Sequence, residues 1–244
     1  MPNRPEHSLS HVSSSTRRFT DRASVYARAR PGYPDGVYEA IERRVAADGP
    51  RRAADMGAGT GIFSAGLLRR GWAVDAVEPN DDMRAVAVAQ LGDRDGFRAV
   101  PGTAERTGLA PASCSLVVAA QAFHWFEPPA CAVEWRRVLR PDGLVALVWN
   151  ERDLGASGFM KAYEELLRRH GRGYDAVSHR RWDTDVIGGF FGPGGADAQV
   201  FASEQRLDLE GLRARLLSAS YCPNVGEPAP EHPNPGDSSP SRRP

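Results

Sequence analysis

The 244-residue sequence has few cysteines, almost no lysine and no long hydrophobic run. Its three cysteines, Cys114, Cys131 and Cys222, stand far apart, which argues against a disulfide framework or a zinc site, and no metal is expected. The longest apolar runs, such as Leu144 to Trp149, are too short to cross a bilayer. The polar start, Met1 to His11, lacks the apolar stretch of a secretory signal peptide. We therefore expect a cytoplasmic protein without a membrane partner.

The charges balance, with 31 basic and 31 acidic residues. A formal net charge of zero does not favour nucleic acid or an anionic membrane as a partner. Lys161 is the lone lysine, so nearly all of the basic residues are arginines. Hydrophobic residues make up 41% and charged residues 25%, as in an ordinary globular protein. A chain of this length has room for one α/β domain rather than two.

Both ends of the chain differ in composition from its middle. Residues 1–20 are rich in Ser, Pro and His without a hydrophobic period, so they are predicted to form a disordered arm. Residues 222–244 contain seven prolines and are predicted to form a disordered Pro-rich tail. The domain itself is predicted to span residues 21–221, with a helical cap at about residues 154–191 over the substrate site.

In the middle of the chain, short apolar runs alternate with helical ones. The expected strands are Ala53 to Met56, Ala73 to Glu78, Phe97 to Val100, Ser115 to Ala120, Leu144 to Trp149 and Val200 to Leu209. The expected helices are one that carries Val37, Ile41 and Val45, then Ile62 to Arg70, Asp81 to Leu91, Ala130 to Leu139, Phe159 to His170, a stretch around Trp182 to Phe191, and Glu210 to Ser220. This rhythm predicts an α/β fold, a Rossmann-like and mostly parallel sheet with helices on both faces.

A glycine-rich segment, Asp55-Met56-Gly57-Ala58-Gly59-Thr60-Gly61, lies where the first strand turns into a helix. Its glycines permit positive φ and let a ligand lie on the backbone, and the helix that follows offers free N–H groups. A dinucleotide-binding fingerprint would have its third glycine at the position of Ile62, whereas here the third glycine is Gly61, one residue earlier. Asp55 would repel a pyrophosphate but attract a cation. The loop therefore suits an adenosyl amino acid better than NAD, although a tight turn without any ligand also fits the glycines alone.

Two more segments extend this pattern. Glu78 closes the second strand about 20 residues past Gly57, where a carboxylate can accept both ribose hydroxyls; taken alone, Glu78 also fits a solvated acid at a strand end. Gly102-Thr103-Ala104-Glu105 follows the third strand and is expected to border the adenine. The Ala104 backbone would face the ring edge, and Glu105 or Thr103 the exocyclic amine. A plain loop with a capping threonine is the competing interpretation.

Together these residues resemble a known family, the class I S-adenosylmethionine-dependent methyltransferases. Within it the resemblance is to the type 11 group that includes trans-aconitate methyltransferase-like proteins. It covers roughly residues 18–221 and rests on Asp55 to Gly61, Val77 to Pro79, Gly102 to Glu105, Gln121 to Phe126 and Val138 to Gly143, with Tyr26 to Pro34 resembling a segment that covers the cofactor. It implies that S-adenosylmethionine is the cofactor and that it is bound by Tyr26, Asp55, Gly57, Gly59, Gly61, Glu78, Ala104, Glu105 and Gln121.

The sequence departs from the family in three places. Thr103 stands where many relatives carry an acid that would face adenine. Ser115 replaces the acid usual at the start of the fourth strand, a position that we expect to be structural. The family's sheet also ends with an antiparallel strand beside the fifth, and this chain reaches its proline-rich tail before supplying one. Either that strand is missing or the strand count is off by one.

The resemblance implies methyl transfer to an oxygen, of a carboxylate or a hydroxyl, or to a nitrogen of a small molecule. Because the methyl donor is already activated, alignment can supply much of the catalysis. His124 is the candidate catalytic base, or else part of an aromatic wall. Arg28, Arg30 and Arg152 are either clamps for a carboxylate or surface charges. Tyr26 and Tyr33 either close over the cofactor or only pack against the first helix and hold it in place.

Two other functions are open to the sequence. One is a catalytically impaired or truncated methyltransferase fold that binds a partner, which the departure near the C-terminus suggests. The other is an NAD-dependent oxidoreductase, against which Ile62 argues.

Overall fold

The computed structural model describes residues 30–46, 49–171, 184–192, 195–219 and 222. The predicted N-terminal arm and residues 223–244 of the predicted tail lie outside these ranges. The chain divides into two compact units, Met1–Glu151 with His179–Ser220, and Arg152–Ser178 with Tyr221–Pro244. The first of these units contains the sheet.

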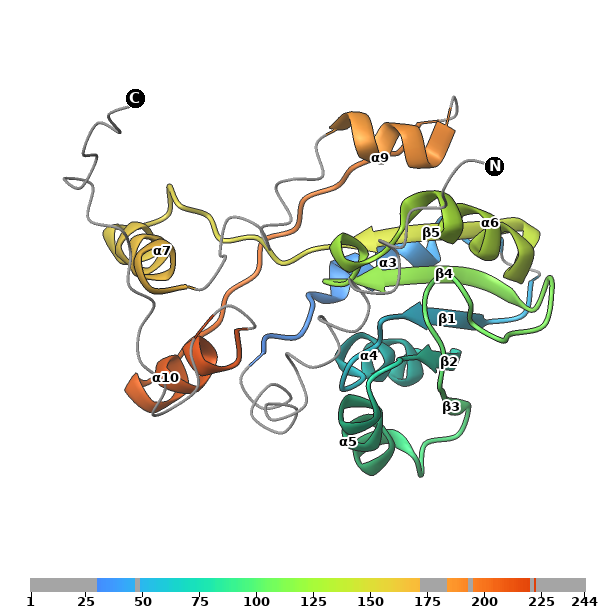
Figure 1. Ribbon diagram of the computed structural model, residues 1–244, viewed down its shortest axis with the longest axis horizontal. Coiled ribbons are helices and arrows are strands. Elements are labelled where there is room, and N and C mark those ends of the chain that lie inside the picture. The colour runs from blue at the N-terminus through green and yellow to red at the C-terminus, as the bar shows by residue number, and fades with distance from the viewer. Residues whose placement is uncertain (1–29, 47–48, 172–183, 193–194, 220–221, 223–244) are drawn as a thin grey trace, which may run out of the picture. The chain divides into compact units, whose positions relative to one another are not determined.

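A five-stranded sheet forms the centre of the larger unit (Figure 1). Its strands are β1 (Arg52–Met56), β2 (Ala73–Val77), β3 (Phe97–Val100), β4 (Cys114–Ala120) and β5 (Leu139–Val148). The spatial order is β3-β2-β1-β4-β5, and all four neighbouring pairs are parallel. This confirms the predicted α/β, Rossmann-like fold. The order reverses between β1 and β4, so a crevice for a ligand is expected at the carboxyl ends of these two strands.

Helices lie on both faces of this sheet. The described helices of the larger unit are α3 (Asp35–Glu42), α4 (Ile62–Arg69), α5 (Asp81–Leu91), α6 (Pro128–Val138), α9 (Thr184–Phe191) and α10 (Leu209–Leu217), with a 3-10 turn η2 (Phe123–Trp125), and α10 has no buried residue. α5 has the predicted bounds because both of its ends are encoded locally. The Asn80 side chain accepts a hydrogen bond from the backbone N–H of Met83 at 2.8 Å, and Gly92 follows the last turn.

The side chains of β1 and β4 alternate between two cores. One core packs Tyr38 of α3 and Phe63 of α4 against the sheet, with ring centroids 4.7 Å apart. The other core packs Trp135 of α6 and Phe190 of α9, with ring centroids 5.4 Å apart. The strand residues divide accordingly: Ala53, Leu116 and Val118 belong to the first core, and Ala54, Val117 and Ala119 to the second. This alternation is the two-residue period of a strand that is buried on both faces.

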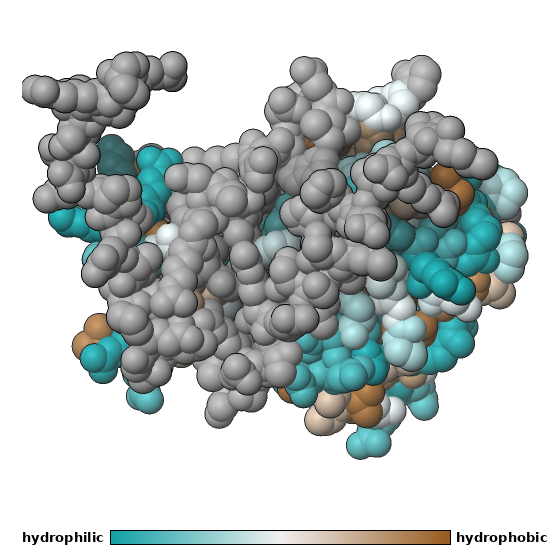
Figure 2. Space-filling model, in the orientation of Figure 1, coloured by the Kyte–Doolittle hydropathy of each residue, from teal (hydrophilic) through white to brown (hydrophobic). Residues whose placement is uncertain are grey.

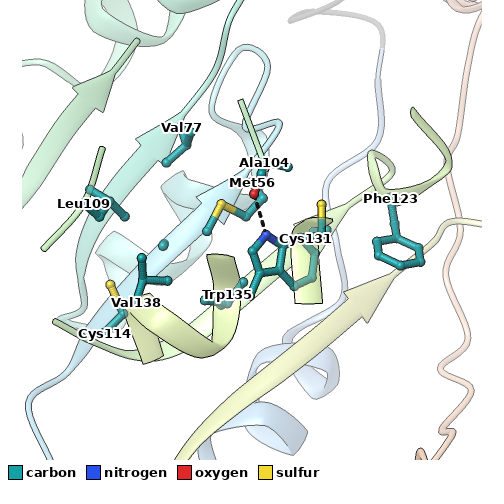
Figure 3. Packing of buried hydrophobic residues seen from close by; sticks show 12 residues of the cluster. Met56, Val77, Ala104, Leu109, Cys114, Phe123, Cys131, Trp135 and Val138 are labelled. Carbon is teal, nitrogen blue, oxygen red and sulfur yellow. Dashed lines mark hydrogen bonds between the residues drawn. The ribbon is translucent and has the colours of Figure 1, made fainter. Parts of the chain in front are cut away.

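Trp135 anchors the loop that follows β3 (Figure 3). Its side chain is 1% exposed, between Met56 and Cys131 of the second core, and its indole N–H donates to the carbonyl of Ala104 at 2.9 Å. A buried indole N–H needs such a partner. The hydrogen bond thereby fixes the predicted adenine-facing loop to α6.

The sixth predicted strand, Val200 to Leu209, is wrong. Residues 200–208 have no regular secondary structure, and α10 already begins at Leu209. The apolar pattern is strand-like, but pairing depends on a distant partner, and most of this segment is exposed. The ring of Phe201 packs at Gly36 of α3, and just before the segment Asp197 forms an ion pair with Arg44. Among the described residues, the sheet therefore ends at β5 without an antiparallel strand.

β5 begins five residues earlier than predicted. Leu139 already pairs with Cys114, and the pairing resumes at Leu144 opposite Leu116, with an irregularity between the two. Residues 140–143, which include Pro141 and Gly143, interrupt the ladder, because proline has no N–H to donate. α10 also ends at Leu217, before the predicted Ser220.

The smaller unit contributes one described helix, α7 (Gly158–His170), close to the predicted Phe159 to His170. The Ser157 hydroxyl caps it by accepting from the backbone N–H of Met160 at 3.3 Å. Glu164 is 5% exposed and pairs with Arg152 at 2.9 Å. The predicted cap at about 154–191 includes residues 172–183, which lie outside the described ranges, so the cap stays a prediction.

The described surface has the polar character expected from the composition. On the face that Figure 2 shows, hydrophobic residues outside the grey regions are interspersed with hydrophilic ones. Large exposed apolar side chains include Val88 of α5 and Val133 of α6. None of the described helices has the length and hydropathy of a membrane span.

Candidate functional site

A hollow opens at the carboxyl ends of β1 and β4, where the order of the strands reverses. Of the predicted cofactor-binding residues, it brings together Asp55, Gly57, Gly59, Glu78 and Gln121. All of them belong to the larger unit. The glycine loop, the end of β2 and the segment after β4 thus meet at one place, as the resemblance implies.

The three glycines of the loop all have positive φ, but they differ in what surrounds them. At Gly57 (φ +65°), a Cβ would lie 2.8 Å from the Cβ of Ala122, so only glycine fits there. At Gly59 (φ +57°), no described atom lies within 4 Å of a Cβ position, so a side chain would project into the hollow. At Gly61 (φ +82°), a Cβ would collide with Leu91 of α5. Gly61 therefore serves packing and the start of α4, whereas the Cβ position of Gly59 is open toward the hollow.

Glu78 joins the end of β2 to the glycine loop. One carboxylate oxygen accepts from the backbone N–H of Gly59 at 2.9 Å, and the other accepts from the N–H of Asn80 at 2.8 Å. The residue is 8% exposed, so the interpretation as a solvated acid is wrong. Burial raises the pKa of the Glu78 carboxyl, while these two hydrogen bonds and the charge of Arg84 oppose the rise. Each oxygen retains a lone pair that can accept another hydrogen bond.

Asp55 is the second acid of the hollow and is 1% exposed. The Ser64 hydroxyl donates to its carboxylate at 2.7 Å. Burial raises the pKa of Asp55 to about 7, against the hydrogen bonds from Ser64, and the nearby charge of Glu78 raises it further. Sequence reasoning missed Ser64. The only signal was a polar residue on the inner side of α4, nine positions after Asp55.

Ala104, Glu105 and His124 are not among the residues that line the hollow. Ala104 is 3% exposed, and the Glu105 carboxylate accepts from the backbone N–H of Glu127 at 3.0 Å. The His124 ring lies tilted beside that of Trp125, with centroids 4.9 Å apart, and it is Trp125 that lines the hollow. Adenine binding by Ala104 and Glu105 and catalysis by His124 stay predictions.

The candidate clamps and covering residues have separate locations. Tyr26 and Arg28 lie outside the described residues, whereas Tyr33 lines the hollow. Arg30 donates to the carbonyl of Ser218 at 3.1 Å. Arg152 belongs to the smaller unit, where it pairs with Glu164 as described above.

Ser115 has a structural contact. Its hydroxyl donates to the carbonyl of Pro50 at 2.6 Å, at the end of β4 opposite the hollow. The position where the family usually carries an acid thus tethers the start of β1 in this chain.

Gln121 has an uncommon backbone. Its φ is +58°, and among described residues other than glycine it shares a positive φ with Ala112 alone. The backbone N–H of Gln121 donates to Val148 at 2.8 Å and its side-chain amide donates to Asn150 at 3.3 Å, so both bonds reach the end of β5. Residues other than glycine that have a left-handed backbone conformation are found more often at binding sites than elsewhere.

The residues of the hollow fit a cationic nucleoside. It combines two carboxylates with open space at Gly59 and the aromatic rings of Trp125 and Phe126, and its described lining contains no Arg, Lys or His. An adenosyl sulfonium would find acceptors for its hydroxyls, negative charge and apolar walls there. No group of three or more candidate metal ligands occurs among the described residues.

The chain is similar to known methyltransferases. Residues 54–147 match the family model described as a methyltransferase domain. An uncharacterized methyltransferase of Mycobacterium tuberculosis is 40% identical over 153 residues, 63% of this chain and 60% of that protein. An uncharacterized methyltransferase-like protein of Schizosaccharomyces pombe is 30% identical over 206 residues, 84% of this chain and 78% of that protein. The solved structure of a putative type II methyltransferase from Anaeromyxobacter dehalogenans matches with a TM-score of 0.56 and 27% identity, covering 79% of each chain.

The chain belongs to the class I S-adenosylmethionine-dependent methyltransferases. The methyl donor of this family is S-adenosylmethionine. The match spans about three fifths of the length of the mycobacterial relative.

Proposed function

We propose that this chain transfers a methyl group from S-adenosylmethionine to an oxygen or nitrogen of a small-molecule acceptor. The observation that carries the proposal is the Glu78 carboxylate, which is buried at the edge of the hollow and bonded to the backbone N–H of Gly59. A carboxylate at this position would accept hydrogen bonds from ribose hydroxyls, beside the one glycine of the loop that faces open space.

The bound cofactor supplies a methyl group on a positively charged sulfur. The role of the chain is then to bind and align. Glu78 accepts hydrogen bonds from the ribose, and the ionised carboxylate of Asp55 favours a cation in the hollow. Trp125 and Phe126 exclude water from one wall. Because the leaving group is already activated, holding the acceptor in line with the methyl group can supply much of the rate enhancement.

The nature of the acceptor belongs to the proposal. A carboxylate acceptor would be ionised at neutral pH and would need no base, whereas a hydroxyl or amine would need one, for which His124 is the candidate. The trans-aconitate methyltransferase-like subgroup, a cytoplasmic location and the absence of a nucleic-acid partner rest on the sequence patterns alone.

The first experiment is calorimetric titration with S-adenosylhomocysteine, the demethylated cofactor. We expect micromolar binding to the wild-type chain, no binding to Gly59→Arg and weaker binding to Glu78→Ala. Gly71→Arg is the matched control, because Gly71 has φ +78° and no described atom within 4 Å of its Cβ position, but does not line the hollow. A folded wild-type protein that gives no heat with this ligand would refute the proposal.

A second candidate function is a methyltransferase fold that binds without turnover. It is favoured by one observation, the position of β5 at the edge of the described sheet without an antiparallel neighbour. The distinguishing experiment is methyl transfer from S-adenosylmethionine to a panel of small acids, phenols and amines. Transfer to any member supports the first proposal, and cofactor binding with no transfer to the whole panel favours the second.

A further inference from the structure

Glu105 lies in a turn that is fixed against α6. Thr103 and Arg106 close this turn through two backbone hydrogen bonds, in which each N–H donates to the carbonyl of the other residue, at 3.2 and 3.1 Å. Ala104, beside Glu105, accepts from the Trp135 indole of α6 as described above. The carboxylate of Glu105 contacts the start of α6, and Glu105 is not among the residues that line the hollow.

This carboxylate supplies a hydrogen-bond acceptor at the N-terminus of α6. One of its oxygens accepts from the backbone N–H of Glu127, the N-cap residue, at 3.0 Å and lies 3.8 Å from the Sγ atom of Cys131. The side chain of Glu127 makes no capping hydrogen bond, and the two prolines that follow it have no N–H to donate. The start of α6 is therefore held by an acceptor from another part of the chain, and its negative charge suits this end of a helix.

The hydrogen bond from Glu105 fixes the backbone directly after Phe126, whose ring lines the hollow. The Phe126 ring also lies against the glycine loop, since a Cβ at Gly57 would be 3.0 Å from it. Its contacts with Phe123 and Trp135 are both edge-to-face, with centroids 6.2 Å apart in each pair. Apolar packing is non-directional, whereas a hydrogen bond sets a distance and an angle. The bond thus determines where this wall of the hollow begins.

We propose that Glu105 is a positioning residue for cofactor binding, because its carboxylate holds Phe126 against the glycine loop through the N–H of Glu127. Glu105 acts through Phe126 and does not touch the ligand itself. This role differs from the one that the resemblance implies, in which Glu105 faces the exocyclic amine of adenine. The inference rests on the proposed function, because it assumes an adenosyl ligand in the hollow.

Calorimetric titration with two ligands separates these roles. The ligands are S-adenosylhomocysteine and S-inosylhomocysteine, in which an oxygen replaces the exocyclic amine. Glu105→Ala removes the acceptor, and Glu105→Gln keeps an oxygen that can accept from the Glu127 N–H. We expect Glu105→Ala to weaken the binding of both ligands by the same factor, about fivefold, and Glu105→Gln to stay within about twofold of the wild type.

Asp208→Ala is the matched control for the loss of a helix cap. The Asp208 side chain accepts from the backbone N–H of Gly211 at 2.7 Å at the start of α10, and Asp208 does not line the hollow. This substitution should leave the affinity for both ligands unchanged.

A double-mutant cycle tests whether Glu105 acts through Phe126. We expect Phe126→Ala to weaken the binding of S-adenosylhomocysteine. Adding Glu105→Ala to Phe126→Ala should then change the affinity by less than about twofold, because the wall that Glu105 positions is already gone. A general loosening of the fold would instead weaken binding by the same factor in both backgrounds.

The other outcomes overturn the inference. Weaker binding of the adenosyl ligand alone would assign Glu105 to the exocyclic amine, and an equal effect of Glu105→Ala in both backgrounds would mean that it does not act through Phe126. Unchanged binding by Glu105→Ala, or equally weak binding by Glu105→Gln, would mean that the bond to Glu127 does not position the wall.

Two provisions keep the test decisive. If Glu105→Ala does not fold, Glu105→Met, which keeps the length of the side chain without an acceptor oxygen, replaces it. If the wild type does not bind the inosyl ligand, the double-mutant cycle decides alone. A folded wild-type chain that does not bind S-adenosylhomocysteine would refute the proposed function, whereas the outcomes above refute this inference and leave the proposed function intact.

Discussion

Asp55→Asn should stabilise the ligand-free protein at neutral and alkaline pH while it weakens cofactor binding. The reason is the burial of Asp55, which raises its pKa to about 7 in the folded chain. In the unfolded chain the carboxyl ionises near its ordinary value of about 4. Between these values the folded protein holds a proton that the unfolded protein has released, so the free energy of unfolding falls as the pH rises.

The pKa values set the size of the effect. The contribution of Asp55 to stability is fully present below about pH 4 and is lost as the pH rises through about 7. A difference of about 3 pH units corresponds to about 4 kcal/mol at most, since one unit is worth about 1.4 kcal/mol. Asparagine can keep the hydrogen bond from Ser64 but leaves its amide N–H groups to be satisfied, which reduces the gain. We therefore expect a net gain of about 1–3 kcal/mol above about pH 7.5.

The assay is urea unfolding of the wild type and Asp55→Asn at several pH values from about 5 to about 8, without ligand. The quantity to follow is the difference between the two free energies of unfolding, because the other ionisable groups cancel in it. This difference should shift in favour of the variant as the pH rises. A difference that is independent of pH, or that moves toward the wild type, would show that the buried Asp55 is not protonated in the folded chain.

Titration with S-adenosylhomocysteine completes this prediction. S-adenosylhomocysteine has no sulfonium, but its amino-acid part carries an ammonium group, so it prefers the ionised Asp55 carboxylate. Wild-type affinity for this ligand should therefore fall about tenfold per pH unit below about pH 7. Asp55→Asn should bind weakly at every pH, without that dependence. A variant that binds as tightly as the wild type at about pH 8 would contradict the electrostatic role of Asp55.

Substitutions at three further positions test the packing and the backbone that hold the site. Gly66→Ala should destabilise the fold by about 2 kcal/mol or more in urea unfolding, because a Cβ there would overlap the buried Tyr38 side chain; an unchanged midpoint would contradict this. Trp135→Phe removes the donor to Ala104 and should cost about 1–2 kcal/mol in the same assay, and a neutral result would mean that the bond is dispensable. Gln121→Gly relieves a positive φ and should raise the thermal midpoint or leave it unchanged, whereas Gln121→Val should lower it; the reverse order would contradict the backbone argument.

Local signals allowed the sequence to predict most of the fold. α5 has its predicted bounds because Asn80 and Gly92 mark its ends, and the first four strands lie within one residue of the predictions because each is a short apolar run between turns. The strand predicted at Val200 failed because strand formation needs a partner that no local pattern encodes. Here Phe201 of the segment packs at Gly36 instead.

The residues of the candidate site that could be predicted from the sequence are those that lie at the end of a strand or directly after one. Asp55, Gly59 and Glu78 end neighbouring strands or begin the loop after one, so the topology brings them together. Ser64 carried no comparable signal. Its importance appears only through its hydrogen bond to the buried Asp55 carboxylate.

Two buried aspartates on adjacent strands differ in the groups that accompany their charge. Asp75 of β2 and Asp55 of β1 are both 1% exposed. Asp75 accepts from Arg52 at 2.8 Å and from Arg98 at 2.6 Å, so two guanidinium groups neutralise its charge. Asp55 accepts from the neutral Ser64 hydroxyl, and no ion pair among the described residues includes it. A buried carboxylate is stable when a cation accompanies it. The protein supplies that cation at Asp75, and at Asp55 a sulfonium or ammonium group of the cofactor would supply it.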